Sequence, residues 1–405
     1  MKKGWEIKKL HEVAEYFNGL TYSPKDVSDK GTIVLRSSNI QNDKLDFSDI
    51  VRVSVSVKEK LFVRDSDILM CSRNGSQRLV GKTAPILNLK EPMTFGTFMM
   101  IIRSEFSSYL LWYFKTDEFK KQISGGENTM INQVTRYMLD EIEIPLPPLP
   151  EQQRIVAILD KTFATITKAK NNAERNLKNA KELFESYLQS VFENGNWEVK
   201  SLEEICDLIS KGSSPKWQGI KYVDEPEVLF VTSENVGENT LLLNERKYVE
   251  KKFNIKEKKS ILMNGDVLTN IVGASIGRTA IYNLDDVANI NQAVCLIRCN
   301  KHLLFNEYLM YLLNSPFTKQ HLHENEVNNA RANLSLGFFR SLTIPFPELA
   351  EQKIVVNKIK GFHIETKKSE AIYLKKIADL EELKKSILQK AFCGELVKSL
   401  KEISV

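Results

Sequence analysis

The sequence predicts an α+β protein in which two tandem α/β blocks are separated by two long antiparallel coiled-coil helices, with a pseudo-two-fold internal repeat. Three observations predict this architecture. Short motifs of the first half return about 200 residues later in the second half. Residues 151–193 contain neither proline nor glycine, and their apolar residues recur at alternating spacings of three and four. The chain of 405 residues is long enough for two or three domains.

The internal repeat runs through the whole chain and fixes the order of its parts. The matching pairs are "GWEIKKLHEVAEY" with "NWEVKSLEEICDL", "IVLRSSNI" with "LFVTSENV", "DILMCSRNGSQRLVGKTA" with "DVLTNIVGASIGRTA", "MIIR" with "CLIR", "YLLWYFKTDEFKKQ" with "YLMYLLNSPFTKQ", "IPLPPLPEQQRIVAILD" with "IPFPELAEQKIVVNKI", and "LQSVF" with "LQKAF". We therefore expect four segments: a first block at 1–150, a central helix at 151–195, a second block at 196–349 and a C-terminal helix at 350–405.

Each block mixes short β-rich runs, glycine turns and one amphipathic helix near Tyr109 or Tyr308. The predicted strands cover residues 51–57, 99–103, 228–232 and 294–298. A duplicated block of this kind suits a target made of two parts, as dimeric DNA-binding proteins suit paired half-sites.

The first long helix is predicted from Glu151 to Glu193, about 43 residues or roughly 60 Å at 1.5 Å per residue. Prolines enforce an extended backbone before it, Glu151 suits the positive end of the helix dipole, and Asn194-Gly195 ends it. Its heptad seam consists of Val156, Leu159, Phe163, Ile166, Lys170, Ala173, Leu177, Ala180, Phe184, Tyr187 and Val191.

The second long helix is predicted from Glu351 to Cys393 and has a more polar seam. Four residues interrupt that seam, namely His363, Thr366, Glu370 and Lys384, and Gly361 lies inside the helix, so we expect a wet or bent stretch there. A long helix cannot bury an apolar stripe by itself. The two helices either pair with each other in antiparallel orientation or form separate oligomer contacts, and the two matched stripes in one chain favour pairing.

Composition and charge exclude several classes of protein. No apolar run is long enough to span a membrane, and the first residues lack the apolar core of a signal peptide. The five cysteines show no framework spacing, so we expect reduced thiols and a cytoplasmic protein without a membrane partner. The formal net charge of +5 permits a polyanionic partner without demanding one.

No motif in the chain predicts catalysis or metal binding. The stretch from Gly75 to Gly81 has one residue too many for a phosphate-binding loop, and the corresponding "GASIGRT" has one too few. Cys295 and Cys299 have no counterparts in the first block, which favours buried thiols over a zinc site. The sequence also lacks nucleophile-elbow, zinc-protease, amino-methyltransferase and restriction-nuclease patterns. We therefore expect no catalytic residues and no metal.

The chain resembles the specificity subunits of type I restriction–modification systems. The resemblance covers the whole chain and depends on Trp-Glu-(Ile/Val)-Lys-x-Leu at the start of each block and on Ile-Pro-x-Pro-x-Leu-x-Glu-Gln before each long helix. It implies a non-catalytic subunit in which each block is a target-recognition domain that reads one half of a bipartite double-stranded DNA site. The paired helices would set the spacer between the halves.

The resemblance also implies partners and cofactors. Two modification subunits, which bind S-adenosylmethionine and methylate adenine, would dock on the helices. Two restriction subunits, which use ATP and Mg²⁺, can join the complex. This chain itself is expected to hold no cofactor.

Candidate DNA-binding residues are polar loop residues at matching places of the two blocks, where Arg suits guanine, Asn adenine and Glu cytosine. They are Arg36, Ser38 and Asn39 with Thr232, Glu234 and Asn235; Arg73, Asn74, Gln77 and Arg78 with Asn270; Asn128, Asn132, Gln133 and Arg136 with Asn329, Arg331 and Asn333; and Lys216 in a serine- and lysine-rich turn. Asn39 and Asn235 are identical in the two blocks, so they can equally be turn formers.

Two other functions remain open at this stage. The chain could be a stand-alone DNA-modifying enzyme, in which case it would turn over substrate without another subunit. It could also be a structural coiled-coil protein that binds only protein, which the low net charge allows. Salt-dependent DNA retention would separate the last possibility from a DNA-binding protein.

Overall fold

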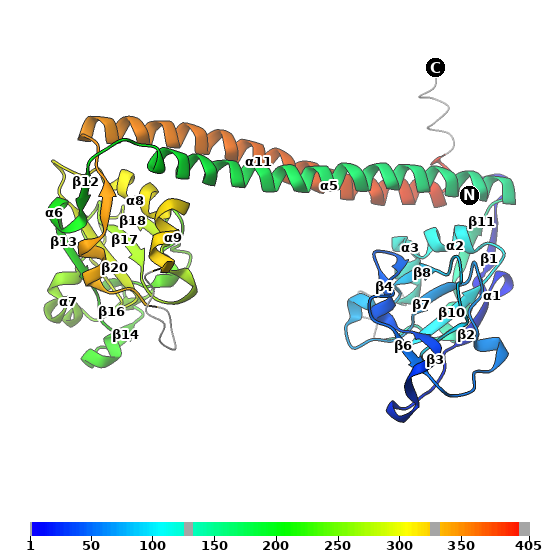
Figure 1. The fold of residues 1–405 in the computed structure, drawn as a ribbon. Helices are drawn as coiled ribbons and strands as arrows, with labels where there is room; N and C mark the ends of the chain where they lie inside the picture. The colour runs from blue at the N-terminus through cyan, green and yellow to red at the C-terminus, as the bar shows by residue number, and fades with distance from the viewer. Residues whose placement is uncertain (1, 125–132, 325–332, 397–405) are drawn as a thin grey trace, which may run out of the picture. The chain divides into compact units, whose positions relative to one another are not determined.

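The computed structural model describes residues 2–124, 133–324 and 333–396. The chain forms two compact units (Figure 1). Unit 1 comprises residues 1–172 and 376–405, and unit 2 comprises residues 173–375. The long helices α5 (Leu149–Glu193) and α11 (Leu349–Phe392) each contribute one part to unit 1 and the other part to unit 2.

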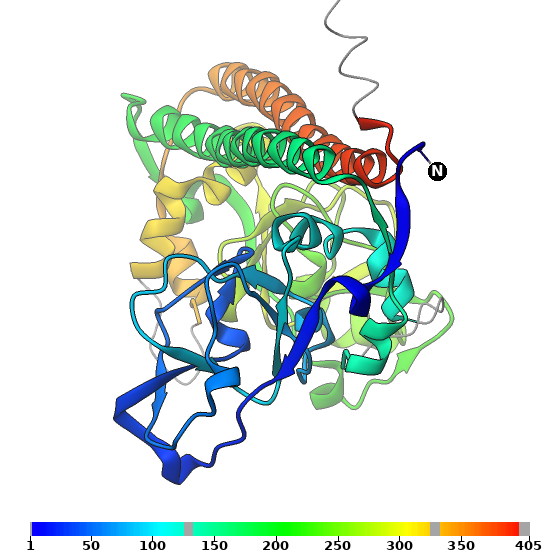
Figure 2. The ribbon, with the colours of Figure 1, turned by 90° about the vertical axis from the view of Figure 1, so that its right-hand side faces the viewer.

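Unit 1 contains two main sheets and a short strand pair next to the long helices. Its strands are β1 (Glu6–Lys9), β2 (Glu15–Asn18), β3 (Val27–Leu35), β4 (Ile40–Gln41), β5 (Lys44–Leu45), β6 (Val51–Val53), β7 (Ile68–Cys71), β8 (Thr83–Pro85), β9 (Met93–Phe95), β10 (Met99–Arg103) and β11 (Glu143–Leu146). Its helices besides α5 and α11 are α1 (Leu10–Val13), α2 (Ser107–Tyr113), α3 (Asp117–Ile123) and α4 (Arg136–Asp140). The sheets have the strand orders β2-β10-β7-β8 and β6-β3-β9, while β1 pairs with β11 and β4 with β5. Figure 2 shows the strands of this unit in blue and cyan.

Unit 2 repeats this topology. Its strands are β12 (Val199–Ser201), β13 (Cys206–Lys211), β14 (Tyr222–Val223), β15 (Val228–Val231), β16 (Tyr248–Val249), β17 (Val267–Asn270), β18 (Thr279–Ile281), β19 (Ala288–Ile290), β20 (Val294–Cys299) and β21 (Thr343–Pro345). Its own helices are α6 (Leu202–Ile205), α7 (Lys252–Lys256), α8 (Asn306–Asn314), α9 (Pro316–Glu324) and α10 (Leu336–Ser341). The order β13-β20-β17-β18 corresponds to β2-β10-β7-β8, and the pair β12-β21 corresponds to β1-β11.

The predicted fold class is confirmed in both units. The predicted strand at 99–103 matches β10, and the other three predicted strands differ from the observed ones in length. β6 ends at Val53, because the following residues turn towards a short 3₁₀ segment at Glu59–Leu61. The observed β20 is one residue longer than predicted, and β15 is one residue shorter.

An ion pair with a buried aspartate joins the end of β10 to the start of β7 in unit 1, and the end of β20 to the start of β17 in unit 2. Arg103 donates from Nε and Nη2 to the carboxylate of Asp67 at 2.8 and 2.7 Å, and Arg298 makes the same two bonds to Asp266. The two aspartate side chains are only 2% and 1% exposed. Such a two-pronged pair fixes the geometry of both strands, and removing one partner would leave a buried charge uncompensated.

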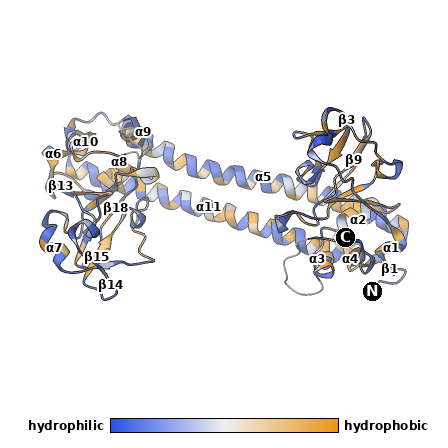
Figure 3. Ribbon diagram, turned by 90° about the horizontal axis from the view of Figure 1, so that it is seen from below, coloured by the Kyte–Doolittle hydropathy of each residue, from blue (hydrophilic) through white to orange (hydrophobic). Residues whose placement is uncertain are grey.

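The long helices pair in antiparallel orientation within each unit. In unit 1 the start of α5, with Ile155 and Leu159, shares a core with Leu388 and Phe392 near the end of α11. In unit 2 the end of α5 packs on the start of α11: Phe184 and His363 have ring centroids 4.6 Å apart, and Tyr187 and Phe362 are 4.4 Å apart. The prediction of mutually paired helices is therefore confirmed within each unit. Hydrophobic and hydrophilic residues alternate along both helices in Figure 3.

The predicted heptad seam of α5 is buried or half-buried at every position, including Lys170. Lys170 donates from Nζ to Glu381 of α11 at 2.7 Å, so the polar seam position carries an ion pair between the two helices. The seam of α11 is polar where expected, but α11 continues as a helix through Gly361 and Thr366. The hydroxyl of buried Thr366 donates to main-chain oxygens one turn earlier, at Phe362 (3.1 Å) and His363 (2.9 Å).

The Pro–Glu-Gln motif is a packing device at the start of each long helix. The buried Gln152 donates from Nε2 to the carbonyl of Pro147 at 2.8 Å, and Gln352 donates to that of Pro347 at 2.9 Å. Gln352 also accepts from the main-chain N–H of Phe305 at 2.7 Å. Each glutamine therefore fixes the bend between the proline-rich strand and the helix.

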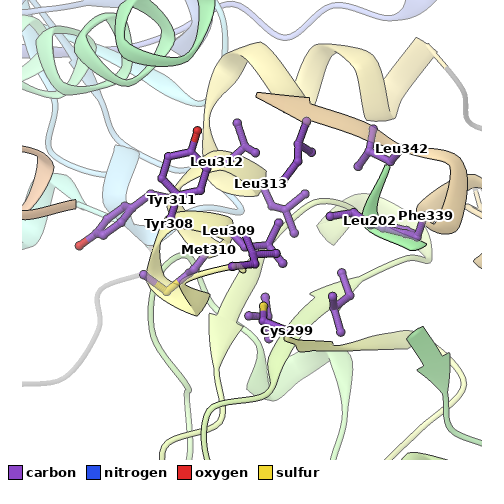
Figure 4. Close-up of a cluster of buried hydrophobic side chains, with 14 of the residues drawn as sticks. Leu202, Cys299, Tyr308, Leu309, Met310, Tyr311, Leu312, Leu313, Phe339 and Leu342 are labelled. Carbon is purple, nitrogen blue, oxygen red and sulfur yellow. The ribbon is translucent and has the colours of Figure 1, made fainter. Parts of the chain in front are cut away.

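One hydrophobic cluster of unit 2 brings α8 together with the long helices, α6, β20 and α10. Figure 4 shows Tyr308 to Leu313 of α8 together with Leu202, Cys299, Phe339 and Leu342. The ring of Phe192 at the end of α5 meets Tyr308 at 5.5 Å, and the Tyr308 hydroxyl donates to the Pro345 carbonyl at 3.0 Å. In unit 1 Phe392 meets Tyr109 at 5.1 Å, and Tyr109 donates to Pro145 at 2.6 Å.

Within the described ranges, no helix combines the length and the apolar character needed to cross a membrane. All five cysteines lie in those ranges, and each is a free thiol.

We expect Gly361→Ala to stabilise the protein by about 1 kcal/mol, because Gly costs about that much relative to Ala inside a helix. Gly361 lies within α11, and nothing lies within 4 Å of the position that an added Cβ would take. Urea unfolding followed by circular dichroism measures the change. Gly212→Ala is the matched control, because its Cβ would meet the Ile290 carbonyl oxygen at 1.7 Å and should destabilise. A neutral or destabilising Gly361→Ala would contradict the expectation.

Candidate nucleic-acid interface

The strand directions of unit 1 collect four polar loops at one edge. β3 and β9 are parallel, with Leu35 opposite Phe95, so their carboxyl ends meet. β7 ends at Cys71 opposite Met99, where β10 begins. The loops that follow β3, β7 and β9 therefore lie together. The segment after residue 132 joins them, because Val134 donates its N–H to the Ser72 carbonyl at 2.7 Å.

Unit 2 builds the same edge with the same strands. β15 and β19 are parallel, with Val231 opposite Ile290. β17 ends at Asn270 opposite Val294, and the N–H of Leu334 donates to the Ile271 carbonyl at 2.9 Å. We call the two edges the reading edges of the units. All three predicted places therefore reach the same edge, and this grouping follows from the topology.

The first predicted place is a short 3₁₀ turn in each unit, at Ser37–Asn39 and Ser233–Asn235. Arg36 donates from Nη2 to Asp49 at 2.6 Å, and its side chain remains 34% exposed. Ser38 is half-buried and Thr232 is buried. Glu234 is the most exposed of the predicted residues here, at 77%, and pairs with Lys247 at 3.1 Å.

Asn39 and Asn235 are turn formers, the alternative that their identity in both units suggested. Asn39 is 1% exposed, accepts from the N–H of Arg36 at 2.8 Å and donates to the carbonyls of Asp46 and Asp49, both at 2.9 Å. Asn235 accepts from the N–H of Thr232 at 2.9 Å and donates to Leu242 at 3.0 Å. Their amides are engaged in shaping the loop on which the exposed residues stand.

At the second place the matching of Asn270 with Arg73 and Asn74 requires a correction. Asn270 lies at the end of β17, where unit 1 has Cys71, and it is completely buried. Its amide donates to the Ser233 carbonyl at 2.9 Å and the Ser275 hydroxyl at 3.1 Å, so it ties two loops together. The repeat itself places Asn270 opposite Cys71 when the two motifs are aligned from Asp67 and Asp266. In unit 1 Asn74 serves a similar role, since it donates to the Ser37 hydroxyl at 3.0 Å.

Gln77 and Arg78 lie on a different surface of the same loop. They line a cavity of about 1800 Å³ in unit 1, together with Lys115, Lys120 and Asp160. This cavity is bounded by the β4–β5 hairpin, α3 and α5. The two residues therefore face the groove beside the helices of unit 1.

The third place is only partly within the described residues. Asn128, Asn132, Asn329 and Arg331 lie outside them. Gln133 and Asn333 are exposed at the reading edges, and Arg136 is exposed at the start of α4. Lys216 is exposed on the 3₁₀ turn Pro215–Gln218.

Several exposed aromatic side chains were not among the predicted DNA-binding residues, which are all polar. Phe98 is 57% exposed, Tyr137 is 76% exposed and Trp217 is 78% exposed. Trp217 follows Lys216 directly, and Tyr137 follows Arg136. The sequence carries a signal at Tyr137 and Trp217: each is a large aromatic residue directly after a basic residue and belongs to no apolar repeat. Such rings can stack on nucleic-acid bases.

The described residues of the reading edges supply hydrogen-bonding and charged groups. Burial raises the pKa of the Cys71 thiol, so it is protonated at neutral pH and is not an activated nucleophile. No group of three or more His, Cys, Asp or Glu side chains that could hold a metal ion occurs in the parts of the chain that are described.

Comparisons with known proteins agree with this arrangement. The family model for the type I restriction modification DNA specificity domain matches residues 2–175 and again residues 194–384. The EcoKI specificity subunit of Escherichia coli strain K12 is 26% identical over 98% of this chain and 90% of its own length. The StySPI specificity subunit of Salmonella potsdam is 25% identical with the same coverage.

Two solved structures share the fold. A chain from a structure of a type I R-M system, described in terms of complex assembly and conformational transition, matches with a TM-score of 0.78 and 20% identity over 98% of this chain and 99% of that chain. The HsdS subunit from Thermoanaerobacter tengcongensis matches with a TM-score of 0.63 and 20% identity over 97% of this chain and 98% of that chain.

We expect Asn39→Ala to lower the free energy of unfolding by about 2 kcal/mol, because two loop carbonyls and the Arg36 N–H lose a buried partner. Chemical denaturation measures the loss. Gln41→Ala is the control: this exposed side chain makes one bond to the Ser38 carbonyl, so the change should stay within about 0.5 kcal/mol. Equal effects of the two substitutions would show that Asn39 does not hold the turn.

Proposed function

Because the chain belongs to the family of type I restriction–modification specificity subunits, we propose that each unit reads one half of a bipartite double-stranded DNA site. The observation that carries the proposal is the duplicated reading edge. The strands and ion pairs that support the edge are the same in both units, while the exposed side chains differ. One frame with two sets of side chains suits a target with two different halves.

The chain is a specificity subunit of an enzyme complex and is not itself the enzyme. Methylation and cleavage then belong to partner subunits. We propose two modification subunits that bind S-adenosylmethionine, and two restriction subunits that use ATP and Mg²⁺ when they join. The chemistry of the reading edges supports this division, since their described residues offer hydrogen-bonding and charged groups that suit binding.

The helices provide a surface for the proposed modification subunits. Ile354 and Ile372 of α11 are 54% and 64% exposed. They are eighteen residues apart, five full turns, and therefore lie on one line along the helix. Ile364, also 54% exposed, lies within about 80° of that line. Exposed apolar residues aligned on a helix are typical of a protein-docking surface.

The block exchange tests the bipartite proposal. Residues 196–343 are replaced by the second block of another family member, and the complex with modification subunits is assayed by mapping methylated sites. One half of the recognised sequence should change while the other half stays the same, because each reading edge is built within one unit. A change in both halves would contradict separate reading. The reciprocal exchange of residues 1–143 is the control and should change the other half.

The helix length tests the proposed spacer. Seven residues that continue the apolar seam are inserted after Asn172 in α5 and after Lys375 in α11, where the two units divide. A heptad turns the stripe by only about 20°, so the seam persists while the helices lengthen by roughly 10 Å. The preferred DNA spacer should grow by about three base pairs at 3.4 Å per pair.

Site mapping on a library with every spacer length measures that shift. The added pairs rotate one half-site by roughly 100° around the DNA axis, so we expect the rate of methylation to fall as well. The heptad in α5 alone is the control, because it leaves α11 without a matching segment. A doubly lengthened, active variant with an unchanged spacer would show that the helices do not set it.

A further inference from the structure

Three residues occupy equivalent positions at the two reading edges. In unit 1, Ser72 and Arg73 directly follow the end of β7. Arg73 forms a β-bridge with Gln133. In unit 2 the counterparts are Ile271 and Val272, and Val272 forms the same bridge with Asn333.

Main-chain hydrogen bonds establish the third position. The N–H of Ser72 donates to the Phe98 carbonyl at 2.9 Å, and the N–H of Ile271 donates to the Ala293 carbonyl, also at 2.9 Å. Phe98 and Ala293 both precede the start of the central strand, β10 or β20. The trio Arg73, Phe98 and Gln133 of unit 1 therefore corresponds to Val272, Ala293 and Asn333 of unit 2.

The unit 1 trio presents a cation on an aromatic ring. The guanidinium carbon of Arg73 lies 5.8 Å from the centroid of the Phe98 ring, which is 57% exposed. The Arg73 N–H also donates to the Phe98 carbonyl at 3.1 Å, so backbone and side chain are both held. Within the described residues, the Arg73 guanidinium has no carboxylate partner. Its five N–H donors are therefore available to a ligand. The contact with the Phe98 ring already orders the side chain, so binding costs less conformational entropy.

The unit 2 trio has a different chemical character. Val272 and Ala293 are half-buried apolar side chains that supply no cation, with Val272 packed against the unit 2 core, and Asn333 presents an exposed amide at the place of Gln133. Arginine binds guanine through two parallel hydrogen bonds, whereas apolar groups contact the methyl group of thymine. The two edges consequently favour different bases at the same structural position.

We propose that Arg73, positioned by Phe98, reads a guanine in the half-site of unit 1, and that Val272 makes the half-site of unit 2 indifferent or averse to guanine at the equivalent position. This inference rests on the proposed function. Arg73 is the residue that determines specificity, and Phe98 is a positioning residue.

The experiment maps methylated sites on a randomised DNA library with the chain assembled with its modification subunits. Wild type should show a G·C pair at one position of one half-site. Arg73→Val should lower that preference by about tenfold to a hundredfold while the other half-site stays the same. Arg73→Lys should fail to restore the preference, because an ammonium lacks the fork that matches guanine. Phe98→Ala should weaken the preference at the same position and at no other.

Matched variants make the test specific. Val272→Arg with Ala293→Phe rebuilds the trio in unit 2 and should create a new guanine preference in the other half-site. Arg64→Val is the control: Arg64 is exposed in unit 1 but precedes β7, at the opposite end from Arg73, and should leave the pattern unchanged. Thermal unfolding of each variant checks that the protein stays folded, above all for Val272→Arg with Ala293→Phe, because both of these side chains are half-buried.

Two results would overturn the inference in distinguishable ways. If wild type shows a bipartite pattern that Arg73→Val leaves intact, the guanine assignment fails and the proposed function stands. If Arg73→Lys restores full activity and Arg73→Val weakens methylation equally at all sequences, Arg73 binds a phosphate and reads no base. A wild-type complex whose methylation shows no bipartite pattern would instead overturn the proposed function itself.

Discussion

Both units depend on a buried glutamine at the start of each long helix. The side chains of Gln152 and Gln352 hold the proline carbonyls that precede the helices, and both glutamines are almost fully buried. The prolines before them cannot donate main-chain hydrogen bonds, so the bend would otherwise leave buried carbonyls without partners. The glutamine amide satisfies them and orients the helix at once. The bend sets the direction in which each long helix leaves the proline segment, and the antiparallel pairing of the two helices begins from that direction.

The Arg–Asp pairs hold the strands of each unit together at the end of the sheet opposite to the reading loops. Each pair joins two neighbouring strands of one sheet: Arg103 with Asp67 joins β10 to β7, and Arg298 with Asp266 joins β20 to β17. Both pairs lie at the ends of these strands that are away from the reading loops. The frame is therefore rigid without drawing on any loop residue. The exposed side chains on the loops take no part in these ion pairs and can change without disturbing them, so one fold can serve the two different half-sites that we propose.

The sequence predicted the repeat, the two helices and their pairing because these features have a strong periodic signal. Heptad spacing and duplicated motifs survive without knowledge of tertiary contacts. The site was harder to predict. Asn270 was grouped by its polar side chain with Arg73 and Asn74, although the aligned motifs and the strand register both place it opposite Cys71, at the buried end of a strand. Exposed rings such as Phe98 carry no periodic signal, since the partner that gives Phe98 its role, Arg73, is 25 residues away in the chain.

The core of each unit also explains why the compact units do not coincide with the segments read along the chain. Phe192 at the end of α5 packs on Tyr308, and Phe392 at the end of α11 packs in the same way on Tyr109. The segments "LQSVF" and "LQKAF" form the last turns of α5 and α11, and each completes the core of one unit: the first packs in unit 2, and the last packs in unit 1. Each long helix therefore begins in one unit and completes the core of the other: α5 runs from unit 1 into unit 2, and α11 runs from unit 2 into unit 1.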